Sequence, residues 1–438
     1  MNNWNEMELG KAIQFNPSER IAKGKIAKKI PMDKLTAYEK KIKGFEFAEY
    51  SAGPKFKNGD TLIAKITPCL ENGKTAQVDL LDDNEVAFGS SEFIVLRQNE
   101  FTINNFIFYL AKSPAFRKRA IGCMEGTSGR KRVNEGALKL QALPIPDKIT
   151  QQKIASVLSA LDSKIELNNR INAELEEMAK TLYDYWFVQF DFPDTNGKPY
   201  KTSGSKMVWN EELRREIPDG WGKGTLNSLG EIIGGSTPPR ENEKYFSKNG
   251  TAWITPKDLS LNTGNKFITK GELDVTEQGI KASSLNVMPK GSILLSSRAP
   301  IGYLAISRES VTTNQGFKSF VPNKGFSTEY VFYTVQSMIP TIENNGVGST
   351  FREVSASTLK TIPISLASKD VAQSFTVIVK DIFERQNILE LENQQLTELR
   401  DWLLPMLMNG QVKVGTMEEE ESFLMAAEPD VAYGKRGI

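Results

Sequence analysis

The 438-residue sequence predicts an α+β fold. It consists of two tandem modules of mixed α/β structure, each followed by a long coiled-coil helix, in a pseudo-two-fold repeat with an antiparallel helix pair. Three observations predict it: an internal repeat, short apolar runs between turns, and two heptad patterns. The predicted segments are a first module at 1–149, its helix at 150–190, a linker at 191–216, a second module at 217–368, its helix at 369–410 and an acidic tail at 411–438.

The second half of the chain repeats the first, with an offset of 221 residues over the end of each module and its helix. The matched pairs include Val133 with Val354, Leu138 with Leu359, Gln152 with Gln373, Asn172 with Asn393 and Leu182 with Leu403. Earlier in each module the match is weaker, and residues 91–93 fall opposite 315–317. A period this long indicates two whole domains rather than a solenoid.

Within each module, short β-like runs alternate with turns, and helical runs are fewer. Strands are predicted at 61–66, 93–96, 292–296 and 318–321, and helices at 104–112 and 328–339. This loop-rich pattern is typical of an α+β domain.

Two long segments carry apolar residues at heptad spacing, which predicts a coiled-coil seam. The first segment holds two series, which start at Ile154 and Leu158. The second holds one series from Phe375 and another from Val371 that runs through Ile378 and Leu399. The residues predicted for the helix seam and for docking of partners are Leu161, Asn168, Asn172, Leu175, Leu182, Ile382, Leu389, Asn393, Leu396 and Leu403.

Two asparagines, Asn168 and Asn172, stand one helical turn apart within the predicted seam. A buried asparagine costs stability but fixes register and orientation, because few pairings satisfy its amide. The alternative is that the helix has a locally exposed stretch there.

The net charge of +1 hides an uneven distribution. Residues 20–43 carry nine basic groups against two acidic ones, and residues 112–132 carry seven against one. Both predicted helices and the tail are net acidic. Basic modules joined by acidic helices suggest a polyanion partner for the modules and a protein partner for the helices. Scattered, solvated lysines are the alternative explanation.

Several kinds of catalysis are excluded by composition. The chain has no histidine, which removes histidine-based nucleophilic catalysis and histidine-ligated zinc, and its two cysteines cannot form a four-thiolate zinc site. Gly73-Lys74-Thr75 resembles the end of a phosphate-binding loop, but Pro68 stands at the first glycine position and a strand-like run follows. We therefore expect no nucleotide, cofactor or metal and no enzymatic activity.

No apolar run approaches the ~20 residues that span a bilayer, and the N-terminus has no signal-peptide pattern. The expected location is the cytoplasm, without contact with a membrane.

Glycine-rich loops that carry polar and basic groups recur in both repeats. Arg and Lys can bind phosphates or guanine, while Asn and Gln can pair with adenine. Each loop alone has the composition of an ordinary surface turn. The candidate DNA-binding residues are Arg20, Lys65, Lys74, Ser91, Arg130, Lys131, Arg132, Thr237, Arg240, Arg298, Asn314, Gln315, Lys318, Ser349 and Arg352.

Four motifs of the second module carry a family resemblance: GGSTPPR at 234–240, WITPKDL at 253–259, LSSRAPIG at 295–302 and TTNQGFK at 312–318. With the two helices, they resemble the specificity subunit of type I restriction–modification enzymes over nearly the whole chain. The first module departs from the pattern, with FNPSER at 15–20 in place of GGSTPPR. This departure leaves individual contacts of the first module open.

The resemblance implies a non-catalytic DNA-reading scaffold with two target-recognition domains, each of which reads one half of a bipartite site in double-stranded DNA. The helices would set the unread spacer and hold two methyltransferase subunits that methylate adenine with S-adenosylmethionine. Two restriction subunits with ATP-driven translocase and nuclease activity would join for cleavage. Such complexes serve host defence.

Three other hypotheses of function are compatible with the sequence. One is the specificity subunit of a related system, in which methylation and cleavage share one partner polypeptide. Another is a stand-alone nuclease or methyltransferase, which the missing motifs disfavour. The third is a coiled-coil adaptor that binds no DNA, which the basic modules disfavour.

Overall fold

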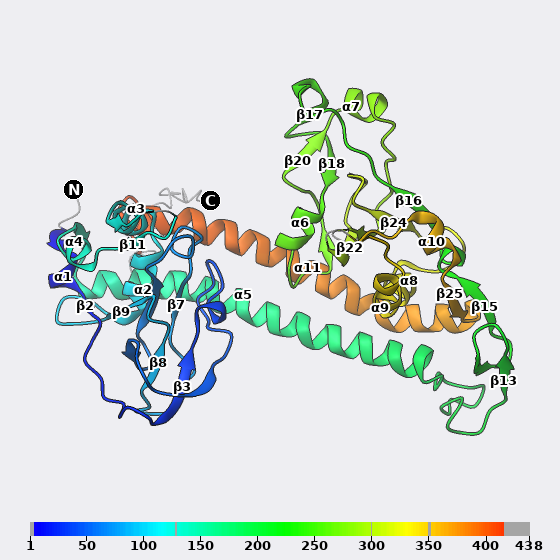
Figure 1. Cartoon of the computed structure of the whole chain (residues 1–438), viewed down its shortest axis with the longest axis horizontal. Helices are drawn as coiled ribbons and strands as arrows, with labels where there is room; N and C mark the ends of the chain where they lie inside the picture. The colour runs from blue at the N-terminus through cyan, green and yellow to red at the C-terminus, as the bar shows by residue number, and fades with distance from the viewer. Residues whose placement is uncertain (1–3, 128, 299, 349–351, 416–438) are drawn as a thin grey trace, which may run out of the picture. The chain divides into compact units, whose positions relative to one another are not determined.

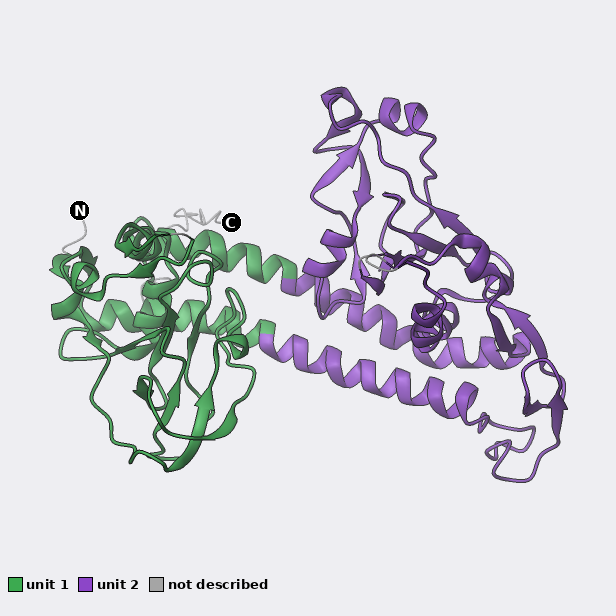
Figure 2. Ribbon diagram, viewed as in Figure 1, with its two compact units in different colours: residues 1–165, 394–438 green, residues 166–393 purple. Residues whose placement is uncertain are grey.

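The computed structural model describes residues 4–127, 129–298, 300–348 and 352–415 (Figure 1). The chain divides into two compact units (Figure 2). Unit 1 joins residues 1–165 with 394–438, and unit 2 comprises residues 166–393. Each long helix therefore contributes one part to each unit, and the units are described separately below.

In unit 1, a module of short strands and helices precedes the first long helix. Its elements are β1 (Asn5–Glu8), α1 (Leu9–Ala12), β2 (Gln14–Phe15), β3 (Ile26–Ile30), η1 (Met32–Lys34), β4 (Glu46–Glu49), β5 (Lys55–Phe56), β6 (Thr61–Ala64), β7 (Thr75–Gln77), β8 (Ala87–Gly89), β9 (Phe93–Arg97), α2 (Asn104–Lys112), α3 (Pro114–Gly122), β10 (Met124–Glu125), β11 (Arg132–Val133), α4 (Glu135–Lys139), β12 (Ala142–Ile145) and the long α5 (Lys148–Tyr183).

In unit 2, a short π-helical segment, η2 (Asp184–Val188), continues from α5. The elements that follow are β13 (Met207–Asn210), β14 (Arg215–Pro218), β15 (Gly222–Thr225), η3 (Leu226–Ser228), β16 (Glu231–Gly234), η4 (Glu243–Tyr245), β17 (Phe246–Ser247), β18 (Thr251–Ile254), α6 (Pro256–Leu261), β19 (Phe267–Ile268), β20 (Leu273–Val275), α7 (Glu277–Ala282), β21 (Ile293–Ser297), β22 (Ile301–Ser307), β23 (Val311–Thr313), β24 (Lys318–Val321), α8 (Thr328–Ser337), α9 (Ile339–Asn344), α10 (Ala356–Thr361), β25 (Pro363–Leu366) and the long α11 (Lys369–Met408).

The two modules share the central strand order of both sheets and differ at the sheet edges, which confirms the predicted repeat and the α+β fold class. The first module has sheets of order β2-β9-β6-β7 and β4-β3-β8-β5. The second has β16-β24-β21-β22-β19 and β17-β20-β18-β23. In both, the second sheet contains one parallel pair, β3 with β8 and β18 with β23. The runs predicted as strands and helices form β6, β9, β21, β24, α2 and α8.

Strand periodicity explains how the central strands of the first module bury both faces. Leu62 and Val95 are direct partners, and both belong to one core cluster. Ile63 and Ile94, the next pair along, belong to another cluster together with α2. Because successive side chains of a strand point to opposite faces, the sheet lies between two apolar layers and all four side chains are buried.

The two long helices run antiparallel within each unit. In unit 1, Ile154 and Leu158 of α5 share a core cluster with Leu404 and Leu407 of α11, where the later residues of one helix meet the earlier residues of the other. In unit 2, Asn168 contacts Asn393 and Tyr183 packs on Phe375 at a ring distance of 5.9 Å. The antiparallel helix pair predicted from the sequence is confirmed.

One heptad series on α11 was assigned wrongly to the seam. Ile378 is 50% exposed and Leu399 is 44% exposed. In unit 2, α11 instead buries Phe375, Val379 and Phe383, which follow a spacing of four residues. This helix packs on the second module as well as on α5, so it buries a wide helical stripe rather than a narrow coiled-coil seam.

Candidate nucleic-acid interface

The WITPKDL motif of the second module is a strand followed at once by a capped helix. Trp253 is buried at the end of β18, and its indole N–H donates to the Ser236 carbonyl at 3.1 Å. Thr255 and Asp258 form a capping box at the start of α6, and Pro256 occupies the first turn. The motif therefore fixes the loop that carries GGSTPPR against the sheet.

The glycine of that loop is required by a close backbone approach. A Cβ on Gly235 would lie 2.1 Å from the Asn314 carbonyl oxygen, which is much shorter than a non-bonded contact allows. The approach brings Thr237 to Gln315, with its hydroxyl donating to the Gln315 side-chain oxygen. Two motifs that are about 80 residues apart in sequence thus form one surface.

Basic residues of unit 2 meet at a carboxylate that sequence reasoning missed. Glu353 lies 3.8 Å from the Arg298 guanidinium and 3.7 Å from the Lys318 ammonium. Arg352 donates to the carbonyls of Asn344 and Gly346 at 3.2–3.4 Å. Ser349, another predicted contact, lies outside the described residues.

A cavity of about 680 Å³ borders this surface. Arg240, Asn314 and two aromatic residues, Phe246 and Trp253, are among the residues that line it. The described candidates of unit 2 thus form two groups: Thr237, Arg240, Asn314 and Gln315 at or next to the cavity, and Arg298, Lys318 and Arg352 at or next to Glu353.

In unit 1, the candidates meet around two further carboxylates that sequence reasoning missed. Arg132 forms a bidentate pair with Glu92, with N···O distances of 2.8–3.0 Å. That hydrogen bond and its charge hold the pKa of Glu92 below the ordinary value. Lys65 contacts Glu135 at 3.4 Å, and exposed Ser91 precedes Glu92.

Arg130 and Lys131 are both exposed in the loop before β11. The Lys131 carbonyl accepts a hydrogen bond from the Thr67 N–H at 3.0 Å, which ties this basic loop to the end of β6. The loop therefore joins the surface formed by Lys65, Ser91 and Arg132.

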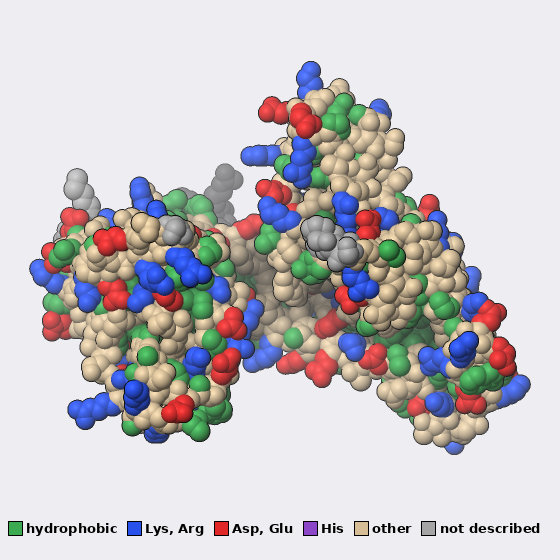
Figure 3. Space-filling view, viewed as in Figure 1, with side chains coloured by type: hydrophobic (Ala, Val, Ile, Leu, Met, Phe, Trp, Pro, Cys, Tyr) green, Lys and Arg blue, Asp and Glu red, His purple; other side chains and the backbone are tan. Residues whose placement is uncertain are grey.

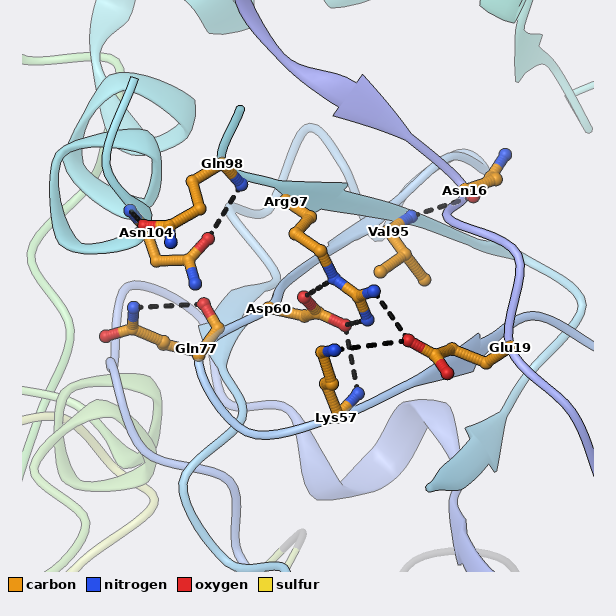
Figure 4. Close-up of polar contacts among 10 residues, drawn as sticks. Asn16, Glu19, Lys57, Asp60, Gln77, Val95, Arg97, Gln98 and Asn104 are labelled. Carbon is orange, nitrogen blue, oxygen red and sulfur yellow. Dashed lines mark hydrogen bonds and ion pairs between the residues drawn. The ribbon is translucent and has the colours of Figure 1, made fainter. Parts of the chain in front are cut away.

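The loop that carries Arg20 is held by the buried ion pair in Figure 4. Arg97 donates twice to Asp60 and once to Glu19, each at 2.6 Å. Lys57 approaches Glu19 at 3.5 Å. Burial alone would raise the pKa of Glu19, but Arg97 and Lys57 together lower it. Arg20 itself is exposed beside this anchor.

Lys74 is not part of the unit 1 surface. Its ammonium donates to the Met32 carbonyl at 3.0 Å, and its backbone bridges Ala37. The amine is thus engaged within the module. The face drawn in Figure 3 likewise shows Lys and Arg interspersed with Asp and Glu. Segment charge could not reveal this, because Lys28 in the basic segment pairs with Asp82 and Glu85.

The internal repeat did contain a signal for Glu353. Its offset places Glu353 opposite Arg132, next to the matched Val133 and Val354. The weaker match of 91–93 with 315–317 likewise placed Glu92 opposite Gly316, whereas no comparable signal marked Glu135.

The ten residues named for the seam and for docking are all partly or fully buried, unlike Ile378 and Leu399 of the wrongly assigned series. Asn168, Asn172 and Leu389 are buried, while Leu161, Leu175, Leu182, Ile382, Asn393, Leu396 and Leu403 are half-buried. Asn168 donates to Glu392 at 2.8 Å and to Asn393 at 2.9 Å.

Among the residues that the structure describes, no helix has the length and apolar character to cross a bilayer. Within the same ranges, no three Cys, Asp or Glu side chains gather closely enough to hold a metal ion.

Comparison with known proteins identifies the repeated modules. Residues 1–177 and 218–400 match the family model of the type I restriction modification DNA specificity domain. The HindI specificity subunit of Haemophilus influenzae is 29% identical over 407 residues, which cover 81% of this chain and 87% of that protein.

A second relative matches only in part. The MjaIX specificity subunit of Methanocaldococcus jannaschii is 36% identical over 211 residues, which cover 45% of this chain and 48% of that protein. The match thus spans about half the length of that relative.

A solved structure shares the fold. The S subunit of a type I restriction–modification system from M. genitalium superposes with a TM-score of 0.54 at 17% identity, over 93% of this chain and 96% of that one. Because the family model covers both modules and most of both long helices, the chain belongs to the type I restriction–modification DNA specificity family and is a specificity subunit of such a system.

Proposed function

We propose that each module binds one half of a bipartite site in double-stranded DNA and that the helices set the unread spacer between the halves. One observation carries the proposal: both modules, in a chain of the DNA specificity family, gather cations around the equivalent crossing of two chain segments, although from different positions. These are Arg132 with Lys65 in unit 1 and Arg298 with Lys318 in unit 2. Such cations suit phosphate and guanine contacts.

The chain supplies recognition and no catalysis in this proposal. Two methyltransferase subunits dock on the helices and methylate adenine with S-adenosylmethionine, and two restriction subunits join them for cleavage with ATP. Exposed apolar residues on the helices, such as Ile388 and Trp402, offer contact area for these partners. The predicted segment boundaries, from the module at 1–149 to the tail at 411–438, are part of the same proposal.

The test is to express the chain with its methyltransferase partner in a host without other methylation and to map methylated adenines. The proposal expects one split sequence, with two constant halves and a spacer of constant length. Methylation that depends on the chain but shows a single uninterrupted site would contradict the division between modules.

Binding of the purified complex to DNA at increasing salt provides a second test. Phosphate contacts make affinity fall steeply with salt concentration. A complex that shows no binding at low salt would identify the chain as an adaptor instead.

A further inference from the structure

One backbone position carries opposite charges in the two modules. In unit 1 the position lies where β11, which ends at Val133, crosses the chain just after β6. In unit 2 it lies where the segment of Glu353 and Val354 crosses the end of β21. In unit 1, the Lys65 N–H donates to the Glu92 carbonyl at 2.9 Å and the Val133 N–H donates to the Lys65 carbonyl at 2.8 Å. Arg132 stands directly before Val133 and bridges Ile66.

Unit 2 repeats these hydrogen bonds. The Ser297 N–H donates to the Gly316 carbonyl at 2.7 Å, and the Val354 N–H donates to the Ser297 carbonyl at 3.0 Å. Glu353 stands before Val354 and bridges Arg298. Glu353 is therefore the structural equivalent of Arg132.

The charged side chains around the position also change sign between the two units. Glu92, which holds Arg132, is replaced in unit 2 by Gly316, which has no side chain. The cations of unit 2 come instead from Arg298 and Lys318. Charge neutralisation is thus kept in both modules, but the sign at the shared position is reversed.

An exposed carboxylate on a DNA-binding surface is repelled by phosphates, so it favours binding only if it accepts a hydrogen bond from a base. Glu353 is 43% exposed, and its contacts of 3.7 and 3.8 Å are longer than hydrogen bonds. Its oxygens therefore keep acceptor capacity for a donor on a ligand.

Arg132 offers hydrogen-bond donors where Glu353 offers acceptors. Its side chain is 49% exposed, and Glu92 fixes one edge of the guanidinium through a bidentate pair. The donors that Glu92 does not occupy have a defined direction, which suits them for the two acceptors of a guanine edge.

We infer that this position determines specificity in both half-sites, an inference that rests on the proposed function. Glu353 accepts a hydrogen bond from the exocyclic amino group of cytosine or adenine in the half-site of the second module. Arg132, positioned by Glu92, donates to the O6 and N7 atoms of guanine in the half-site of the first module.

The test uses the full chain in complex with its methyltransferase partner and duplexes that carry the methylated site of the wild-type complex. Binding is measured for a panel in which each base pair of either half is replaced in turn. Three variants are compared with wild type: Glu353→Gln, Arg132→Gln and, as a control with the same loss of charge, Glu309→Gln on the exposed turn between β22 and β23.

Glu353→Gln is expected to change discrimination at one base pair of one half by roughly 5- to 150-fold, with a shift towards adenine, which glutamine can pair. Arg132→Gln is expected to lose discrimination at one base pair of the other half. Glu309→Gln should leave every discrimination ratio unchanged.

Uniformly tighter binding of Glu353→Gln to all duplexes, with unchanged ratios, would overturn the inference, because it would reduce Glu353 to a source of repulsion. Changes by Glu353→Gln and Arg132→Gln in the same half would overturn it too. A wild-type complex without sequence-specific binding would instead overturn the proposed function.

Discussion

Asn168 of α5 donates a hydrogen bond of 2.9 Å to the side-chain oxygen of Asn393 on α11. Asn393 in turn donates to Asn169 at 2.7 Å. Asn168 is fully buried, so a shifted register would leave its amide without a partner. The heptad pattern predicted both the burial and a role in fixing the register; the structure shows the burial, and the partner helix supplies the second amide.

Replacement of one asparagine of this pair should reduce the free energy of unfolding more than replacement of both. Asn393→Leu leaves the buried Asn168 amide short of an acceptor, which should reduce the free energy of unfolding by ~1–3 kcal/mol. The double variant Asn168→Leu with Asn393→Leu should recover part of that loss. Urea unfolding of the four proteins in the cycle gives the coupling, and strictly additive losses would contradict the assignment.

The ion pair of Asp60 and Arg97 should matter more for stability than exposed ion pairs. Asp60→Ala leaves the Arg97 guanidinium, whose side chain is 12% exposed, without its main partner, so unfolding should become ~3–5 kcal/mol easier. The control is Glu272→Ala, which removes the exposed pair with Lys257 and should leave stability unchanged. Equal effects of the two variants in thermal unfolding would refute the distinction.

Stability of unit 1 should depend on pH through Lys112. Burial, together with the charge of Arg400, lowers the pKa of Lys112 to about 8. The unfolded chain keeps this proton to higher pH than the folded chain does, so stability rises between about pH 8 and pH 10.5. Lys112→Met lacks this gain.

The free energy of unfolding of Lys112→Met, minus that of the wild type, should therefore fall by up to about 3 kcal/mol across that range. Urea unfolding at successive pH values measures it, with Lys118→Met on the exposed side of α3 as the control. A difference that stays constant with pH would show that Lys112 keeps its ordinary titration.

Arg130→Ala and Arg352→Ala should each weaken DNA binding by the complex. Both residues lie in loops just before the equivalent valines, Val133 and Val354. A lost phosphate contact should lower affinity for every sequence and reduce the salt slope by about one unit. Arg170→Ala, on an exposed face of α5, is the control. Gel shifts over a salt series measure the affinity and its salt dependence. Variants with the affinity and salt slope of the wild type would show that these loops lie away from DNA.

Paired insertions in the long helices should lengthen the spacer of the recognised site. Four helix-forming residues after Ile165 and four after Asn393 fall where the two units divide, and add ~6 Å to each helix. That is close to two base-pair steps at ~3.4 Å, and four residues nearly preserve the buried face of each helix. Methylome mapping should show both halves unchanged with one or two extra base pairs between them.

An insertion in α5 alone, after Glu177, serves as the contrast. It separates Glu176, which contacts Lys266, from Ala179 in the core of unit 2, so it should damage folding rather than change the spacer. An active paired-insertion variant with the original spacer would contradict the role of the helices in setting spacer length.

The local part of the structure could be predicted from the sequence. Short β-like runs between turns predicted the strands, and heptad spacing predicted the long helices, because both signals depend on neighbouring residues. The repeat placed Val133 opposite Val354, and the hydrogen bonds of both modules agree with that match.

The polar networks could not be predicted. Lys266 stands in an ordinary turn sequence, yet its ammonium contacts Glu176 at 2.6 Å and Gln386 at 2.8 Å. These partners are about 90 and 120 residues away, so no periodicity links them. The same holds for Glu92 and Arg132, whose pairing depends on the crossing of two distant strands.

The split of each long helix between two units has a consequence for synthesis on the ribosome. Ile154, Leu158 and Asp162 leave the ribosome with the first module, but their partners Leu404 and Arg400 follow only after the whole second module. Until then, Ile154 and Leu158 pack only on the first module, and Asp162 lacks its counter-charge. The packing of unit 1 is therefore completed only when the last turns of α11 have been synthesised.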